Sequence, residues 1–106
     1  MSDTIPSKIV REIVADILIE RSNALDDAAD ELAQQELEQY GYTGQYAASV
    51  GWEAAGTRVL ADEVRLGIIS IKEAIHEILT PQEREEAKMR CANWIIQSEN
   101  TFAHEH

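Results

Sequence analysis

The sequence predicts an all-α protein, a compact bundle of four helices in which the first helix is long. Three observations favour this class: β-branched residues follow helical rather than alternating spacing, the chain has only two prolines, and 44% of its residues are hydrophobic, as in ordinary folded chains. A chain of 106 residues has room for one domain with a modest core. We therefore expect residues 1–106 to form a single all-helical domain.

The first helix is expected to begin near Ser7, after Pro6, and to continue to a turn at Gly41, because no glycine or proline intervenes. A length of about 33 residues gives a rod of roughly 50 Å at 1.5 Å per residue. A break at Ser22 and Asn23 is the alternative, since both residue types are good N-caps. At 100° per residue the apolar side chains share one broad face: Val10, Val14, Ile17, Leu18, Leu25, Ala28 and Leu32.

The segment YGYTGQ, residues 40–45, predicts the turn into a second helix. Gly41 suits the left-handed position that ends a helix, and Thr43 suits the N-cap of the next one. The second helix is then expected from about Gly44 to Leu66, ending at Gly67.

Two capping boxes predict the remaining helices. Residues 70–73 (SIKE) place a serine three positions before a glutamate, which indicates a short third helix ending at Leu79. Residues 80–83 (TPQE) repeat this pattern with Pro81 at the favoured first position. The fourth helix is expected to run to about Asn100 and to bury four side chains: Ala87, Cys91, Trp94 and Ile95.

Two glycines lie inside the second helix, where each costs about 1 kcal/mol relative to alanine. A strip of small residues surrounds them: Ala47, Gly51 and Ala55 at spacings of four, with Ala48 and Gly56 beside them. We expect this strip to let the first helix pack at short interaxial distance. The alternative is that the strip leaves room for a ligand.

The charge balance excludes several classes of function. A net charge of −11, from 20 acidic and 9 basic side chains, disfavours direct nucleic-acid binding, which needs Lys and Arg for the phosphates, and an acidic membrane surface would repel the chain. Arg11, Glu12 and Asp16 interrupt the first apolar run, so neither a secretory nor a spanning segment is predicted. The cytoplasm is the expected location. Cys91, the only cysteine, is expected to be a buried structural thiol.

The acidic residues predict a binding surface. No Lys or Arg lies between Ser22 and Thr57, and seven carboxylates of the first helix fall within about 100° of one another, opposite its apolar face, along roughly 40 Å. One interpretation is a solvated face that keeps the protein soluble; the other is a surface for a protein partner with a basic surface. The predicted partner-binding residues are Glu12, Asp16, Glu20, Asp27, Asp30, Glu31, Glu38, Tyr40 and Tyr42.

The aromatic and basic residues near this surface carry further expectations. Tyr40, Tyr42 and Tyr46 cluster at the turn, either as interface anchors or as plugs for the end of a bundle, with Tyr42 favoured as exposed and Trp52 as packed. The two arginines of the first helix, Arg11 and Arg21, are expected at its rim, paired for example with Glu36 or Glu53.

The sequence therefore predicts a small acidic regulator or inhibitor that binds a protein partner, with no enzyme activity, catalytic residue, cofactor or metal site. One alternative is partial nucleic-acid mimicry; here the resemblance to small acidic helical proteins that block restriction or CRISPR machinery is one of charge and size only. Another is a metal-binding helical homo-oligomer built on Glu73 and His76, and a third is a simple homodimer. The histidines of residues 104–106 could capture a divalent cation adventitiously.

Overall fold

The computed structural model describes residues 5–104, with side chains through residue 99. It confirms the all-α class, the four helices and the long first helix. The order is α1 (Ser7–Tyr40), α2 (Gln45–Leu66), a short third helix made of α3 (Ile71–Glu73) and the π-helical turn η1 (Ala74–Ile78), and α4 (Pro81–His104). The helix ends fall within one or two residues of the predicted positions, and α4 extends a few residues further.

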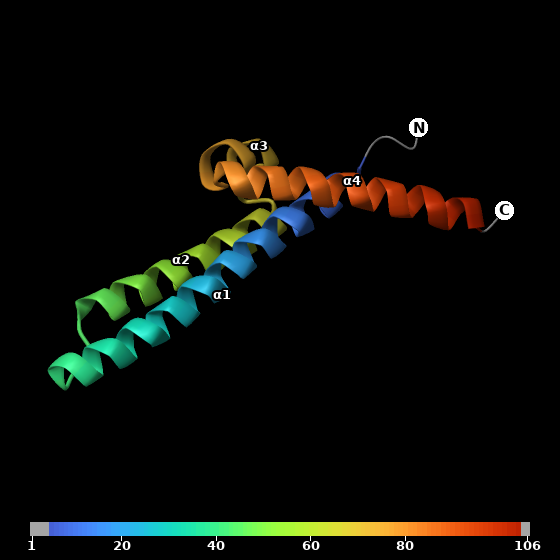
Figure 1. Cartoon of the computed structure of the whole chain (residues 1–106). Helices are drawn as coiled ribbons and strands as arrows, with labels where there is room; N and C mark the ends of the chain where they lie inside the picture. Colours follow the sequence, from blue (N-terminus) through green and yellow to red (C-terminus); the bar gives the residue numbers. More distant parts are fainter. Residues whose placement is uncertain (1–4, 105–106) are drawn as a thin grey trace.

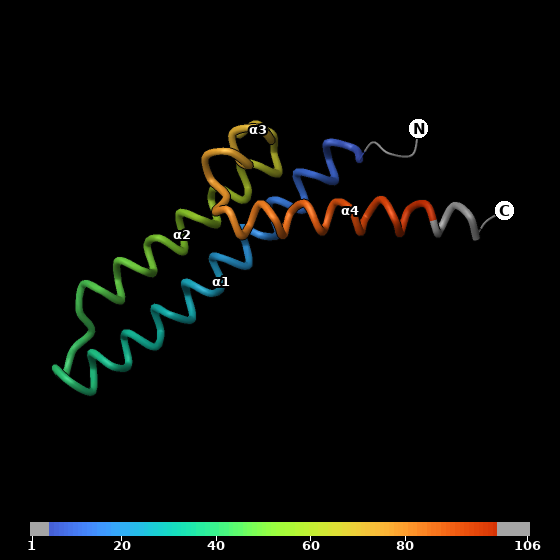
Figure 2. The backbone as a smooth tube through the Cα atoms, turned by 45° about the horizontal axis from the view of Figure 1, so that its top comes forward, coloured from blue at the N-terminus to red at the C-terminus, as the bar shows by residue number. Residues whose placement is uncertain are grey.

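The helices are arranged as a long hairpin with a small head at one end. α1 and α2 run antiparallel side by side, while α3, η1 and the start of α4 gather at the opposite end from the turn (Figures 1 and 2). We call residues 22–57 the arm, and residues 5–21 together with 58–99 the head. The expectation of a compact bundle is wrong: the extents are 64 × 28 × 21 Å and the radius of gyration is 18.0 Å, against about 13 Å for a compact domain of this length.

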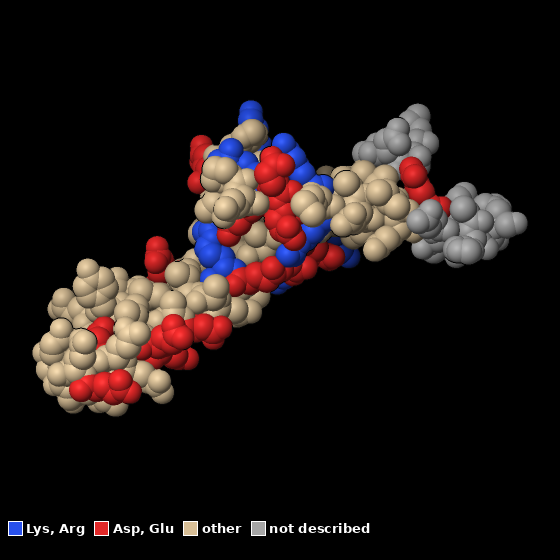
Figure 3. Space-filling model, viewed as in Figure 1, with Lys and Arg blue, Asp and Glu red and all other residues tan. Residues whose placement is uncertain are grey.

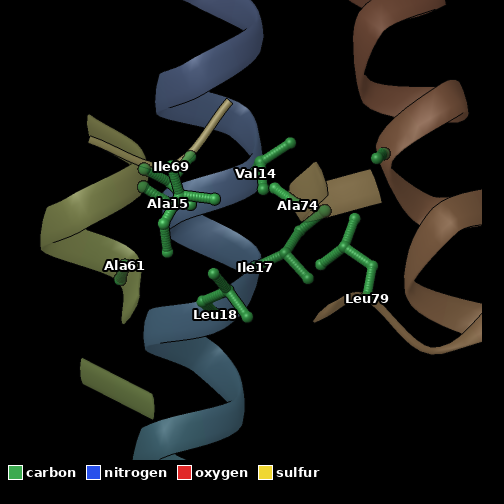
Figure 4. Packing of buried hydrophobic residues seen from close by; sticks show 10 residues of the cluster. Val14, Ala15, Ile17, Leu18, Ala61, Ile69, Ala74 and Leu79 are labelled. Atoms are coloured by element: carbon green, nitrogen blue, oxygen red, sulfur yellow. The ribbon is translucent and has the colours of Figure 1, made fainter. Parts of the chain in front are cut away.

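The apolar core lies in the head. Figure 4 shows Val14 and Ile17 of α1 facing Ala74 and Leu79, which follow in the chain from the buried Ile69. The arm lacks such a third layer, because α1 and α2 pack there only on each other (Figure 1). This distribution of apolar contacts explains the elongated shape.

α1 is continuous through the position where a break was considered. Ser22 is fully buried, and its hydroxyl donates a hydrogen bond of 2.8 Å to the carbonyl oxygen of Ala54 on α2. A buried hydroxyl paired across the two helices costs little and fixes their relative position.

α1 and α2 approach each other through small residues spaced by seven, a heptad pattern typical of a straight antiparallel seam. The prediction that the glycine strip makes this contact is wrong. Among the described residues, a Cβ built on Gly51 or Gly56 would meet no atom within 4 Å. Steps of four rotate a strip away from a seam that needs alternating steps of three and four. The residues of the seam are Ala15, Ser22 and Ala29 on α1, and Ala47, Ala54 and Ala61 on α2.

Two side chains of α1 fix the ends of α2. The Glu36 carboxylate accepts hydrogen bonds from the backbone N–H groups of Gly44 and, at 3.1 Å, Ala47. This carboxylate replaces the expected cap from Thr43, because no side chain of the turn itself caps α2 among the described residues. At the other end, Nη1 of Arg11 donates to the carbonyl oxygens of Val64 at 3.3 Å and Ile69 at 3.2 Å.

Arg21 joins α1 to the start of α4. Its guanidinium donates to both carboxylate oxygens of Glu83, at 2.8 Å for Nε, and to the Ile78 carbonyl oxygen at 2.9 Å. Glu83 also completes the predicted capping box, accepting the Thr80 N–H at 2.9 Å and donating its own N–H to the Thr80 hydroxyl at 3.2 Å. The expected pairing of Arg11 and Arg21 with Glu36 or Glu53 is therefore wrong.

α4 packs less deeply than predicted. Ala87 is buried, but Cys91, Trp94 and Ile95 are only half-buried. The reason is that α4 crosses the start of α1 and then extends beyond it (Figure 1), so α1 covers only part of its apolar face.

Candidate interaction surface

The seven carboxylates of α1 share one exposed side, as predicted for a continuous helix. All seven side chains are exposed. The fold nevertheless divides them into two groups with different surroundings: Glu12, Asp16 and Glu20 belong to the head, and Asp27, Asp30, Glu31 and Glu38 belong to the arm.

The head group is partly neutralised by neighbouring arginines. Asp16 lies 3.4 Å from Nη2 of Arg65 on α2. Glu20 accepts hydrogen bonds of 2.7 and 2.8 Å from Arg90 on α4, and this contact lowers the pKa of Glu20 and raises that of Arg90. These carboxylates therefore contribute to holding α2 and α4 against α1.

The arm group has no such partners. All nine Lys and Arg residues of the chain lie within residues 8–21 and 58–90. Within residues 5–99, Asp27, Asp30, Glu31 and Glu38 form no ion pair with any of them. Figure 3 shows the result on one face: blue atoms gather around the head, and the arm carries red patches only. Basic charge for these carboxylates must come from another molecule.

Two further arm carboxylates are engaged within the chain. Asp26 pairs with Arg58 at 3.0 Å, at the boundary between arm and head. Glu36 is used to cap α2. The unpaired carboxylates thus lie on the outward side of α1 and continue to the tip of the hairpin.

The tip is aromatic and exposed. Tyr40 and Tyr42 are 64% and 65% exposed, with ring centroids 6.2 Å apart at an interplanar angle of 40°. Together with Tyr46 they line an open hollow of about 840 Å³ between the end of α1 and the start of α2. The tyrosines therefore do not plug a bundle end. Trp52 is 78% exposed on α2, so its predicted packing is wrong.

Leu37 is a surface residue that the sequence interpretation missed. It is 54% exposed and lies one turn before Tyr40 on α1. Its position in the sequence could have shown this, because at 100° per residue Leu37 falls outside the apolar face that includes Leu32. An exposed leucine beside tyrosines and carboxylates extends the apolar part of the tip.

The other candidate chemistry does not assemble into a site. Glu73 and His76 are both exposed, and the described residues contain no group of three or more His, Cys, Asp or Glu side chains arranged to hold a metal ion. Residues 104–106 lie outside the described side chains. Burial raises the pKa of the half-buried Cys91 thiol, which disfavours its nucleophilic thiolate form.

No helix within the described range combines the length and hydropathy needed to cross a bilayer. Comparison with known proteins gives no match to a family, to a curated protein or to a solved structure. Function must therefore be argued from the surface alone.

Proposed function

We propose that this protein binds the basic surface of a protein partner through the outward side of its arm, and thereby acts as a regulator or inhibitor of that partner. The contact residues are Asp27, Asp30, Glu31 and Glu38, with Tyr40 and Tyr42 at the tip. The observation that carries the proposal is the separation of charge, since four exposed carboxylates lack any basic neighbour while every Lys and Arg lies elsewhere.

Unpaired carboxylates on one side of a helix repel one another, by a few tenths of a kcal/mol for each pair at helical spacing. A basic surface relieves this repulsion and steers the encounter, over a screening length of about 8 Å at physiological salt. Charge alone gives speed and orientation more than affinity. The exposed tyrosines supply the second requirement, because they bury large areas with few rotors to fix.

The proposal requires no chemical step. By occupying a basic surface, the arm prevents that surface from binding its usual ligand. The head has a separate task, which is to hold α1 and α2 at their base through the Arg21–Glu83 contact. Changes in the arm surface should therefore affect binding without unfolding the protein.

The test uses three forms of the protein as bait in lysate of the organism that encodes it. The first is wild type. The second carries Asp27→Lys, Glu31→Lys and Glu38→Lys in the arm. The third is a control with Glu73→Lys, Glu77→Lys and Glu99→Lys, which are exposed, form no ion pair within residues 5–99, and change the net charge by the same amount.

We expect wild type and the control to capture the same basic protein, and the arm variant to lose it. For the purified partner, the dissociation constant of the arm variant should rise at least about tenfold, with a weaker dependence on salt than wild type, because each lost contact removes about 1 kcal/mol or less at an exposed site. Equal capture by all three baits at low and high salt would exclude the arm carboxylates as the binding surface.

A further inference from the structure

α2 carries a second apolar face that nothing in the chain covers. On the side away from α1, Trp52, Val59 and Leu66 recur every seven residues and are 78%, 54% and 75% exposed. The exposed small residues Ala48 and Ala55 lie between them on the same side at 100° per residue. Large exposed apolar side chains at heptad spacing are typical of a helix face that packs on another helix.

The inner face of α2 shows what such a pattern binds. There, Ala47, Ala54 and Ala61 also recur every seven residues, with larger residues such as Val64 between them, and this face packs on the antiparallel helix α1. The outer face repeats the alternation of small and large residues one position further along the chain. Its geometry is therefore suited to another antiparallel helix.

We propose that the outer face of α2 binds the same face of a second copy, forming a two-fold symmetric dimer with the two α2 helices antiparallel. A two-fold axis beside residues 53 and 54 places Trp52 opposite Ala55 of the second copy. The same axis places Val59 opposite Ala48 of the second copy. Every large residue then meets a small one, so the face is complementary to itself, which a symmetric dimer requires.

The two glycines of α2 fit this arrangement. Gly51 and Gly56 flank the face and have nothing within 4 Å of a Cβ position among the described residues. Their cost of about 1 kcal/mol each in a helix has no return within one chain. A second helix crossing at this level can approach closely because both flanks lack side chains.

Charge favours the antiparallel orientation. It sets each arm, which has no Lys or Arg, beside the head of the second copy, where all nine Lys and Arg residues lie. A parallel pair would instead align two arms of seven carboxylates each. Between Gln45 and Thr57 the only charged residue of α2 is Glu53, so the centre of the face carries little like charge.

The same register brings the tip of one copy near Leu66 and Ile68 of the other. These two side chains are 75% and 70% exposed. A helix of this length gives a face of roughly 33 Å at 1.5 Å per residue. One such face lies at the lower end of stable interface sizes, about 800 Å² per partner, so we expect a dissociation constant in the micromolar range. This inference does not rest on the proposed function, because it leaves the outward side of α1 uncovered.

Analytical ultracentrifugation tests the dimer. Wild type should pass from monomer to dimer across micromolar concentrations, and Trp52→Glu should remain monomeric with an unchanged helical circular dichroism spectrum and melting temperature in dilute solution. Tyr46→Glu is the matched control, since Tyr46 is equally exposed on the same helix but lies off the face, and it should dimerise as wild type does. A wild type that stays monomeric at high concentration overturns the proposal, and so does a dimer that Trp52→Glu leaves intact.

Cysteine cross-linking tests the orientation. Ala48→Cys and Val59→Cys are made separately in a Cys91→Ser background and treated with a bis-maleimide that spans about 8 Å, the distance between packed helices. In the antiparallel pair these two positions face each other, while each lies about 16 Å from its own copy along the axis. We expect dimer only when the two variants are mixed. Cross-linking of each variant with itself would indicate a parallel pair and overturn the arrangement.

Discussion

Glu83 takes part in more contacts than any other acidic side chain of the head. It accepts hydrogen bonds from Arg21 and from the Thr80 N–H while its own N–H is capped by the Thr80 hydroxyl. Burial alone would raise its pKa, but the hydrogen bonds from Arg21 and Thr80 outweigh burial and lower the pKa. The charged carboxylate is therefore a structural element that joins α1, η1 and α4.

This lowered pKa predicts how stability depends on pH. A group whose pKa is lower in the folded state contributes stability at neutral pH, and that contribution is lost as the pH falls through the acid range. We expect Glu83→Gln to cost about 2 kcal/mol at pH 7, the value of a charge-assisted hydrogen bond, and to show a shallower loss of stability in acid than wild type. Denaturant unfolding between pH 7 and pH 3 measures both. The exposed Glu85→Gln is the control, and an acid dependence unaltered by Glu83→Gln would contradict this role.

Gly51 is a second residue with a defined expectation. A Cβ at this position meets no atom within 4 Å among the described residues, so Gly51→Ala introduces no clash. Because alanine favours the helix by about 1 kcal/mol over glycine, we expect the free energy of unfolding to rise by about that amount. Thermal unfolding in dilute solution measures the change. A marked loss of stability would show that the backbone at Gly51 packs closely after all.

Among the helices, the α1–α2 pair depends on alanines spaced by seven. Ala54 is fully buried in the seam, while its neighbour Ala55 is exposed on the other side of α2. We expect Ala54→Leu to force the helices apart and cost about 1–3 kcal/mol, and Ala55→Leu to cost almost nothing in dilute solution. Comparable effects of the two substitutions on denaturant unfolding would contradict the assignment of the seam.

The ends of α2 offer a further test on this pair. Glu36 caps the start of α2 from the neighbouring helix, and a capping carboxylate interacts favourably with the helix dipole. We expect Glu36→Ala to lower the stability by about 1 kcal/mol and to increase amide hydrogen exchange in the first turn of α2. The exposed Glu38→Ala serves as the control. Unchanged exchange at Gly44 and Ala47 in the Glu36 variant would exclude the cap.

Helix ends could be predicted from the sequence because their signals are local. Gly41 and Gly67 adopt the left-handed conformation expected of them, and residues 80–83 form their capping box. The packed side of α2 could not be chosen correctly, since spacings of four and of seven were both present and only the neighbouring helix decides between them. The partners of Arg21 were also out of reach, because Glu83 is 62 positions away in the chain.

The same division applies to the candidate surface. Its exposure follows from helical periodicity, and all seven carboxylates of the α1 side are exposed as expected. Periodicity could not show that Arg65 and Arg90 come across from other helices to pair with Asp16 and Glu20. Long-range contacts of this kind reduce the unpaired surface to the arm.

For the molecule as a whole, shape and charge are distributed together. The head holds the core and all of the Lys and Arg residues, and the arm extends from it with carboxylates and exposed aromatic side chains. An arm with two free sides can bind a basic partner along α1 and a second copy along α2 at the same time. Both proposals require that the arm does not fold back onto the head.

Small-angle X-ray scattering in dilute solution tests this requirement most directly. For the monomer, extrapolated to zero concentration, we predict a radius of gyration close to the 18.0 Å of the structure and a maximum dimension consistent with its 64 Å length. A radius of gyration near 13 Å, the value for a compact domain of this size, would show that the arm packs against the head and that its carboxylates and aromatic residues are not the free surface described above.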